Sequence, residues 1–276
     1  MSLPRPPPVR LSAVVSDVDG TLVTDDKRLT DRVRAAVARI RAAGLPFCLI
    51  SSRPPRGLAP VMHALEVDTP TACFNGGVVV GPDLAPLEEH LLTPAASRRA
   101  IEFLEARGLG VWLFSDGQWM LRNPAGPYVD HEHRTVGFAP VVVAGFDGAL
   151  EKAAKIVGVS ADFDRLARCE AELAAMMGNS ASVVRSQRYY LDTTAPAANK
   201  GAGLQALARR LGVPAREIAV VGDGANDVAM FAESGLAIAM GNALQAVQAR
   251  ADHVSASNGA DGFADAVERF ILAARP

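Results

Sequence analysis

The sequence predicts an α/β fold, in which a doubly wound, mostly parallel sheet forms a core that is interrupted by an inserted α+β unit. At both ends of the chain, strand-like apolar runs alternate with helix-like segments, which is typical of a parallel sheet covered by helices. Between about residues 81 and 195, the strand signals are shorter and most of the aromatic residues gather. This change of pattern indicates a second unit.

The first part of the predicted sheet occupies residues 13–74. A strand is expected at 13–16, after which Thr30 can cap a helix and Gly44 can close it. The continuous apolar run 45–50 is typical of a buried parallel strand. The further expected elements are a helix near 58–65 and a strand at 71–74.

The same alternation resumes near the C-terminus. Its expected elements are helices at 200–211 and 228–234 and strands at 218–221 and 236–239. Each strand ends in small or polar residues. Because open parallel sheets bind ligands beyond the carboxyl ends of their strands, we expect these strand ends to converge on one site.

The intervening segment has its own mixture of elements. Helices are expected at 95–106 and 162–177, and strands at 111–114, 155–159 and 189–191. We predict that residues 1–82 and 195–276 form the core domain and that 83–194 form the insertion. Two linkers would join the parts and allow the insertion to hinge over the site.

Composition restricts the classes of function. Hydrophobic residues make up 49% of the 276 residues and charged residues 21%, a globular balance with ample material for a core. A formal net charge of −2 offers no basic field for nucleic acid or an anionic membrane. Cys48, Cys73 and Cys169 are far apart and predict reduced core residues. No apolar run approaches the roughly 18 residues of a membrane span, and the proline-rich residues 1–10 lack a signal-peptide core, so we expect a cytoplasmic protein.

Two carboxylates follow the first predicted strand. The period of two in a strand places Asp17 and Asp19 on the same side, and Gly20 lets the backbone bend directly afterwards. Paired carboxylates in this position can hold a divalent cation or react beside one. The structural alternative is a surface turn, because Asp and Gly are common turn residues.

Four clusters at strand ends resemble the sequence motifs of the haloacid dehalogenase superfamily, most closely those of its Cof-type phosphatases. The matching segments, in family order, are Asp17-Val18-Asp19-Gly20-Thr21-Leu22, Ser51-Ser52-Arg53, Asn199-Lys200-Gly201 and Gly222-Asp223-Gly224-Ala225-Asn226-Asp227. Further agreement lies at Asn75-Gly76-Gly77, at Ala239-Met240-Gly241-Asn242-Ala243 and at Ala251-Asp252-His253-Val254, which is followed by Asn258 and Gly262. The resemblance spans essentially the whole chain and implies a Rossmann-like core that carries an α/β cap.

The resemblance implies separate roles for the two acids of the first segment. Asp17 matches the nucleophile that forms an aspartyl phosphate, as carboxylates do in phosphate chemistry. Asp19 matches the general acid that protonates the leaving alcohol, and its backbone carbonyl would be a metal ligand.

The resemblance also implies a Mg²⁺ site. Mg²⁺ prefers oxygen ligands, and Asp17 and Asp223 are the direct carboxylate candidates. Asp227 would bind the metal directly or through water and would orient Asp223. An acid in the first turn of a helix can also stabilise that helix through its dipole, and Asp227 can do both.

The expected phosphate and substrate contacts are Ser51, Ser52, Arg53, Asn75, Lys200 and Asn226. Ser51 would donate its hydroxyl to the phosphoryl group, and Lys200 would offset charge on nucleophile and phosphate. Arg53 reaches a substrate oxygen or is only a solvated loop residue. Close relatives generally carry Thr-Gly-Arg here, so Ser52 places a side chain where the backbone approaches the phosphate.

Two other features of the sequence are expected to have structural and not catalytic roles. The pair His131 and His133 flanks Glu132, but residues two apart on a helix point in different directions and no third ligand is evident. We therefore expect a structural or solvent-exposed role for this segment. Trp112 and Trp119 are expected to pack in the inserted unit.

The insertion lies in the long interval between Ser51 and Lys200, as in the α/β caps of the Cof group, which exclude water and select the leaving group. We expect a Mg²⁺-dependent phosphatase for a small phosphorylated metabolite, with sugar phosphates ahead of nucleotide and cofactor phosphates. Neither nucleic acid nor a membrane is an expected partner, and the oligomeric state is left open. The alternatives are a phosphosugar mutase and a non-catalytic regulator that binds a phosphometabolite, although the intact acids and Lys200 argue against the regulator.

Overall fold

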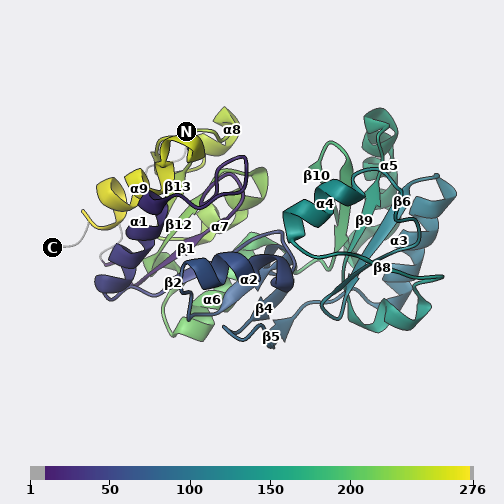
Figure 1. Ribbon diagram of the computed structural model, residues 1–276, viewed down its shortest axis with the longest axis horizontal. Coiled ribbons are helices and arrows are strands. Elements are labelled where there is room, and N and C mark those ends of the chain that lie inside the picture. The colour runs from purple at the N-terminus through teal and green to yellow at the C-terminus, as the bar shows by residue number, and fades with distance from the viewer. Residues whose placement is uncertain (1–9, 274–276) are drawn as a thin grey trace. The chain divides into compact units, whose positions relative to one another are not determined.

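The computed structural model describes residues 10–273, which divide into two compact units (Figure 1). Residues 10–52, 59–87 and 199–273 form the first, here called the sheet unit. Residues 53–58 and 88–198 form the second, here called the inserted unit. The short segment 53–58 therefore groups with residues that follow it much later in the chain.

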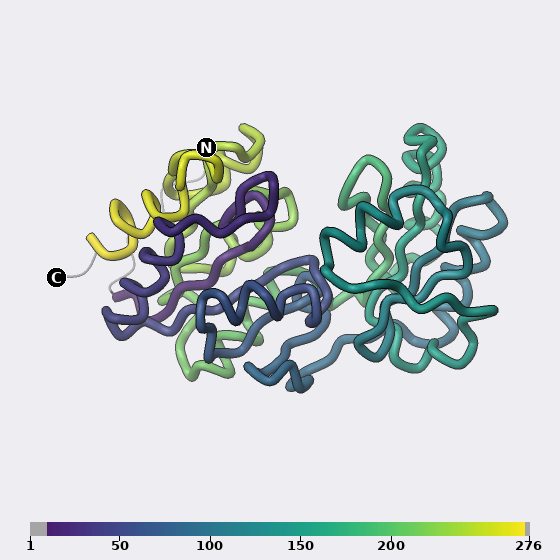
Figure 2. Tube along the Cα trace, viewed as in Figure 1, coloured from purple at the N-terminus to yellow at the C-terminus, as the bar shows by residue number. Residues whose placement is uncertain are grey.

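The sheet unit is built on five parallel strands in the order β14-β13-β12-β1-β2. Their bounds are β1 Ala13–Ser16, β2 Phe47–Leu49, β12 Ile218–Gly222, β13 Leu236–Ala239 and β14 His253–Val254. Strands from opposite ends of the chain lie side by side, since β1 pairs with both β2 and β12 (Figure 2). Because Ser16 is paired with Val221, the residues that follow these two strands emerge at the same edge of the sheet.

A small sheet, β3-β4-β5, continues this unit, and the chain passes into the inserted unit within β5. Its strands are β3 Thr71–Cys73, β4 Val78–Val80 and β5 Pro86–Glu89. A parallel bridge between Ile50 and Ala72 joins it to the end of β2.

Helices cover both faces of the parallel sheet. On one face, Leu204 of α6 and Phe231 of α7 share a buried cluster with Val15 and Val220. On the other face, Phe263 of α9 meets Phe47 edge-on at 5.9 Å. The α-helices of the chain outside the inserted sheet are α1 Asp31–Ala42, α2 Pro55–Ala64, α6 Lys200–Leu211, α7 Val228–Glu233, α8 Gln245–Gln248 and α9 Gly262–Ala266.

The inserted unit contains a six-stranded sheet in the order β10-β11-β9-β6-β7-β8. Its strands are β6 Gly110–Ser115, β7 Gln118–Leu121, β8 Val141–Val142, β9 Ala153–Val159, β10 Ser182–Gln187 and β11 Tyr190–Thr194, and its helices are α3 Pro94–Ala106, α4 Val129–Val136 and α5 Phe163–Met177. Leu104 of α3 and Leu173 of α5 are buried with Ile156 and Leu191 on one face of this sheet. The opposite face carries Trp112, Trp119 and Tyr190, which form edge-on ring contacts.

Short 3₁₀-helices and the π-helix η7 complete the described part of the chain. They are η1 Phe74–Gly76, η2 Asp147–Lys152, η3 Gly178–Ser180, η4 Ala215–Glu217, η5 Ala225–Asp227, η6 Asn258–Ala260 and η7 Val267–Ile271. Segment η1 directly follows β3, and Asp223 and Gly224 separate β12 from η5.

The predicted fold class is confirmed, with a parallel core and separate inserted sheet. Helix α6 and strand β13 have the predicted bounds, whereas the run 45–50 supplies only the three-residue strand β2. Strands β4, β5, β7, β8, β10 and β14 were not predicted. The expected proline-rich lead-in lies largely outside the described residues. Within residues 10–273, the three cysteines are buried and form no disulfide, and no helix has the length and hydropathy needed to cross a bilayer.

Candidate active site

A buried lysine bridges two of the predicted acids. Lys200 is the first residue of α6, and its Nζ lies 2.6 Å from an oxygen of Asp17 and 2.6 Å from an oxygen of Asp227. The side chain of Lys200 is only 1% exposed, and such burial requires charged partners. Burial alone would lower the pKa of Lys200, but the two carboxylates outweigh it and raise this pKa. The ammonium group therefore stays protonated.

Asp17 is a buried acid that lies close to two other acids and to one lysine. It directly follows β1, is 5% exposed, and lies near Asp223 and Asp227 as well as Lys200. Burial raises the pKa of Asp17 well above its ordinary value, the charge of Lys200 lowers it, and the two other acids raise it again. A further positive charge at this place would stabilise the ionised form.

Asp223, at the end of β12, completes a group of three carboxylates. One oxygen from each of Asp17, Asp223 and Asp227 lies within 4.8 Å of the others. Burial, followed by the charge of Asp227, raises the pKa of Asp223 to about 6. The Thr21 hydroxyl donates to Asp223 Oδ1 at 3.0 Å. The parallel pairing of β1 with β12 is what brings these acids together.

Asp227 differs from the other two acids because both of its oxygens already accept strong donors. Its Oδ2 accepts the backbone N–H groups of Asp223 at 2.9 Å and Gly224 at 2.7 Å, while Oδ1 accepts Lys200. In contrast, Asp17 Oδ2 accepts the Thr21 hydroxyl at a long distance of 3.5 Å. The oxygens of Asp17 and Asp223 are thus the better placed to accept a cation.

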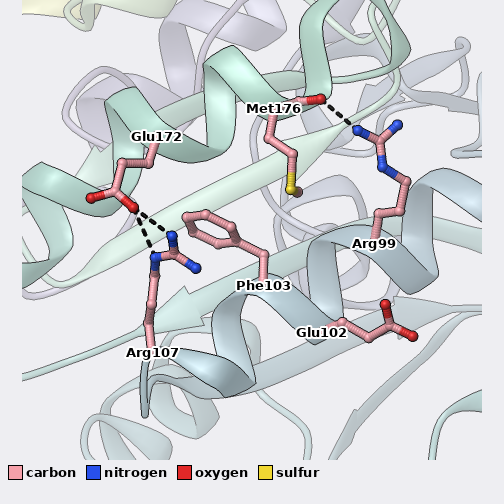
Figure 3. Close-up of a pocket in the computed structure, with 6 residues that line it drawn as sticks. All are labelled: Arg99, Glu102, Phe103, Arg107, Glu172 and Met176. Atoms are coloured by element: carbon pink, nitrogen blue, oxygen red, sulfur yellow. Dashed lines mark hydrogen bonds and ion pairs between the residues drawn. The ribbon is translucent and has the colours of Figure 1, made fainter.

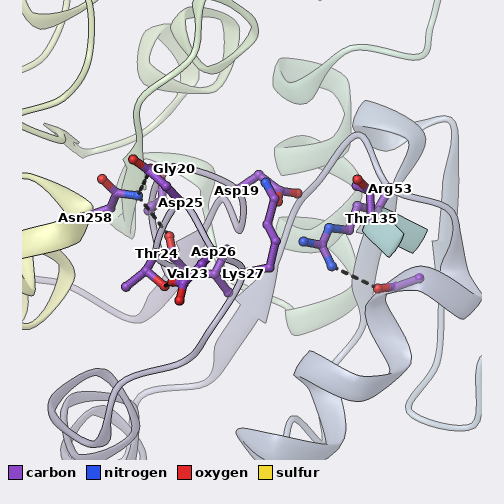
Figure 4. Close-up of polar contacts among 12 residues, drawn as sticks. Asp19, Gly20, Val23, Thr24, Asp25, Asp26, Lys27, Arg53, Thr135 and Asn258 are labelled. Atoms are coloured by element: carbon purple, nitrogen blue, oxygen red, sulfur yellow. Dashed lines mark hydrogen bonds and ion pairs between the residues drawn. The ribbon is translucent and has the colours of Figure 1, made fainter. Parts of the chain in front are cut away.

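The turn after β1 requires glycine at position 20. Gly20 has φ +79°, and a Cβ there would lie 2.3 Å from Asp223 Oδ2. The Asn242 side chain donates to Gly20 O at 2.9 Å and fixes this turn beside β13. Farther along the loop, Asn258 donates to Val23 O at 3.1 Å (Figure 4).

Asp19 lies outside the group of three carboxylates. Its Oδ1 pairs with Lys27 Nζ at 2.7 Å, and its side chain is 28% exposed (Figure 4). A carboxylate near the surface can exchange protons with solvent, unlike the buried Asp17. The expected metal contact through the Asp19 carbonyl stays a prediction.

Hydrogen bonds link three of the predicted phosphate contacts. Asn75 N–H donates to Ser51 O at 2.8 Å, and Asn226 Nδ2 donates to Asn75 Oδ1 at 2.9 Å. Ser51 is buried just beyond β2, and Asn75 adopts φ +58° within η1. The ends of β2, β3 and β12 therefore converge in the sheet unit, as the sequence predicts.

Ser52 and Arg53 lie at the point where the chain leaves the sheet unit. Ser52 is half-buried and belongs to the sheet unit, whereas Arg53 is buried in the inserted unit. Arg53 Nη1 donates to Gly57 O at 3.3 Å. Contacts of either residue with a substrate stay predictions.

Sequence reasoning assigned no role to Thr21 or Asn242, although both contact the acids. Thr21 donates to Asp223, and Asn242 Nδ2 lies 3.4 Å from the other oxygen of Asp223. The sequence did carry a signal for both residues, because each lies in a segment that resembles a family motif and follows a strand.

Comparisons with known proteins agree over nearly the whole chain. Residues 14–267 match the family of haloacid dehalogenase-like hydrolases. A protein of Haemophilus influenzae named putative phosphatase is 27% identical over 253 residues, which cover 91% of this chain and 95% of the relative. A protein of Cronobacter sakazakii named HMP-PP phosphatase is 25% identical over 86% of this chain and 87% of its own length.

Solved structures match both units. A haloacid dehalogenase-like hydrolase from Bacteroides thetaiotaomicron has a TM-score of 0.87 and 28% identity, and the match covers 95% of this chain and all of that one. A structure described as a sugar phosphatase of subclass IIB has a TM-score of 0.83 at 21% identity, covers 94% of this chain and 98% of that one, and supports the fold alone.

Proposed function

The chain belongs to the haloacid dehalogenase-like hydrolases, in their Cof-type group, and from this membership we propose that it hydrolyses a sugar phosphate with the help of Mg²⁺. It is a phosphatase for small phosphorylated metabolites. The observation that carries the proposal is Asp17 beside the protonated Lys200. A buried carboxylate held by a fixed cation is suited to nucleophilic attack on phosphorus.

The proposed reaction proceeds in two steps. An oxygen of Asp17 attacks the phosphorus atom, the bond to the ester oxygen breaks, and Asp19 donates the proton that makes this oxygen an alcohol. Asp19 then accepts a proton from water, whose oxygen attacks the aspartyl phosphate and releases inorganic phosphate and the Asp17 carboxylate. The exposure of Asp19 supports its exchange of protons, and the burial of Asp17 supports its separate role.

The three carboxylates fit a divalent cation by their chemistry. They are hard oxygen donors, and burial together with their mutual repulsion raises the pKa values of Asp17 and Asp223. We propose that Asp17 and Asp223 hold Mg²⁺, with the Asp19 carbonyl, and that Asp227 positions Asp223 through its backbone N–H. Bound Mg²⁺ would offset charge on the phosphoryl oxygens.

We assign phosphate binding to Ser51, Ser52, Asn75, Lys200 and Asn226, and contact with the substrate to Arg53. The hydrogen bonds from Asn226 to Asn75 and from Asn75 to Ser51 support a preorganised phosphate pocket. On this proposal the sheet unit supplies the phosphoryl chemistry and the inserted unit recognises the leaving group.

The names of several relatives support the substrate class. They include 5-amino-6-(5-phospho-D-ribitylamino)uracil phosphatase in Bacillus subtilis, 23% identical over 96% of this chain. We therefore place sugar phosphates first, ahead of nucleotide and vitamin phosphates.

The test is a panel of sugar, nucleotide and vitamin phosphates incubated with purified protein and Mg²⁺, with release of inorganic phosphate as the readout. Hydrolysis of sugar phosphates supports the proposal. Exchange between isomers that requires a bisphosphate, without net phosphate release, would identify a mutase. Thermal stabilisation by ligands without any phosphate release would identify a regulator.

We also propose a cytoplasmic location. The buried, unpaired thiols of Cys48, Cys73 and Cys169 support a reducing compartment. Cell fractionation would test this, since recovery outside the cytoplasm would contradict it.

A further inference from the structure

The loop that follows β1 holds a lysine against the proposed acid. Lys27 Nζ lies 2.7 Å from Asp19 Oδ1, and the two side chains are 43% and 28% exposed (Figure 4). Ion pairs with this much exposure contribute little to stability. The free energy of folding therefore does not explain why a lysine occupies this position.

Lys27 has a backbone conformation that normally belongs to glycine. Its φ is +63°, in the left-handed region where a Cβ is strained. Thr24 N–H donates to Arg28 O at 3.0 Å and Lys27 N–H donates to Thr24 O at 2.8 Å, so residues 25–27 form a tight turn. The last position of such a three-residue loop usually carries glycine. Since the lysine adds strain to the backbone, a function of its side chain is the better explanation.

Hydrogen bonds from side chains fix this turn. The Thr24 hydroxyl and Arg28 Nε both donate to Asp26, each at 2.5 Å, and together they lower the pKa of Asp26. Arg28 N–H donates to the Thr24 hydroxyl oxygen at 3.2 Å. The backbone on both sides of Lys27 is therefore held in place, which limits where its side chain can reach.

A residue from the far end of the chain joins this loop to the turn after β1. Asn258 is buried, and its Nδ2 donates to Val23 O at 3.1 Å and to Asp25 Oδ1 at 3.0 Å (Figure 4). Its backbone N–H donates to Asn242 Oδ1 at 2.9 Å, and Asn242 Nδ2 donates to Gly20 O. The loop and the turn are thus fixed to one framework, which lies entirely within the sheet unit.

The proposed reaction changes the charge of Asp19. When Asp19 gives its proton to the ester oxygen, its carboxyl group becomes a carboxylate, and the ammonium group of Lys27 is placed to stabilise the charge that develops. The same contact holds the carboxyl group in one orientation. Lys27 can do this through Asp19 alone, without touching the substrate.

We propose that Lys27 is a positioning residue for the acid Asp19 and assists proton transfer to the leaving group. This inference rests on the proposed function, because Asp19 is the acid only on that proposal. It implies that the contribution of Lys27 depends on how strongly the leaving oxygen needs a proton.

Other exposed ion pairs are held differently. In a hollow of about 450 Å³ between α3 and α5, Arg107 Nε donates to Glu172 at 3.0 Å, and the guanidinium group lies over the ring of Phe103 (Figure 3). Packing on an aromatic ring gives this arginine a structural role. Lys152 is the matched control for Lys27, because it pairs with Glu89 at 2.9 Å and the two side chains are 53% and 31% exposed.

The test measures kcat/KM for two kinds of phosphate ester. The alkyl ester is glucose 6-phosphate, or the alkyl ester of the wider panel that wild type hydrolyses better, and its leaving alcohol needs a proton. The aryl ester is p-nitrophenyl phosphate, which releases a stable anion. Because kcat/KM covers only the steps up to departure of the leaving group, hydrolysis of the aspartyl phosphate does not affect it.

Lys27→Gly is the informative variant, because it removes the ammonium group and suits the conformation of the turn. Tm should stay close to that of wild type. We expect kcat/KM to fall by about tenfold for the alkyl ester and by less than about twofold for the aryl ester. In an Asp19→Asn background, the same change should alter kcat/KM for the alkyl ester by less than about twofold, since the two residues act together. Lys152→Met should match wild type with both esters.

The outcomes separate the inference from the proposed function. If wild type releases no phosphate from any ester, the proposed function fails. If wild type hydrolyses an alkyl ester, then equal losses with both esters in Lys27→Gly, no loss with either, or a selective loss in Lys152→Met overturns the inference alone. A full further loss in the Asp19→Asn background would show that Lys27 acts independently of Asp19, and hydrolysis of the aryl ester only would show that no acid assists the reaction. Both of these results would also overturn the inference.

Discussion

At the residue scale, Lys200 determines the charge balance of the site. It is the cation that directly contacts Asp17 and Asp227, and its position at the start of α6 fixes where that charge lies. The same residue therefore serves folding and, on our proposal, catalysis. The two contributions can be separated by changing either Lys200 or the nucleophile.

Asp17→Asn should abolish turnover without unfolding the protein. An amide is a poor nucleophile, so we expect kcat for the best substrate to fall by about a thousandfold or more. The substitution also removes a buried carboxyl group whose pKa is raised by burial. Because the ionised form of this group is unfavourable in the interior, thermal stability should not fall sharply. Phosphate release and thermal unfolding are the measurements. A variant with substantial activity would show that another residue is the nucleophile.

Lys200→Met should destabilise the fold by about 3–5 kcal/mol, because it leaves two buried carboxylates without their cation. Lys27→Met, which removes a lysine that is 43% exposed, should cost less than about 1 kcal/mol. Urea denaturation of both variants measures the difference. Equal losses of stability would mean that burial does not strengthen the Lys200 pairs.

The sequence identified residues of the site more readily than their partners. The positions of Asp17, Lys200, Asp223 and Asp227 could be grouped because each lies at a predicted strand end or helix start. Their hydrogen bonds could not be read in the same way. Both oxygens of Asp227 are occupied by Lys200 and two N–H groups, a fact that depends on the three-dimensional turn after β12.

At the scale of elements, the buried strand β12 was predictable and the exposed edge strand β10 was not. Strand β12 is apolar throughout and fully buried, so its sequence predicts it directly. Strand β10 lies at the edge of the inserted sheet, and Val184 within it is 55% exposed. Edge strands bury too little surface for a clear apolar pattern.

Gly20→Ala should impair activity more than stability. An alanine at φ +79° costs about 1–2 kcal/mol, and its Cβ would also displace Asp223. Gly44→Ala is the control, since Gly44 has φ +75° but no atom within 4 Å of a new Cβ. We expect similar losses of stability, but a fall in kcat/KM of at least about tenfold only for Gly20→Ala. Equal activities of the Gly20→Ala and Gly44→Ala variants would show that the turn after β1 does not contribute to the proposed site.

At the scale of the whole molecule, the acids couple stability to pH and Mg²⁺. The pKa of Asp223 is about 6 in the folded protein and 3.8 as its reference value. The native state therefore binds more protons in this interval, and without metal stability should fall as pH rises through it. Mg²⁺ favours the ionised acids, so its stabilising effect should grow over the same range.

Thermal unfolding with and without Mg²⁺ at about pH 5 and about pH 7.5 tests this coupling. We expect the larger shift in Tm at the higher pH. Asp223→Asn should lose most of the shift. A shift that is equal at both pH values would contradict the coupling.

The pairing of β1 with β12 has a consequence for the order of folding. The Lys200–Asp17 pair joins residues 183 positions apart, whereas residues 88–198 of the inserted unit are continuous in the chain. Contacts between distant residues form slowly, because closing the long loop costs entropy. We expect backbone amides of β9 and β11 to gain protection before those of β1 in pulse-labelled hydrogen exchange during refolding, and earlier protection of β1 would contradict this. During synthesis on a ribosome, the inserted unit would thus fold before β12 emerges. The nucleophile Asp17, although made much earlier, would reach its final position only when β1 pairs with β12.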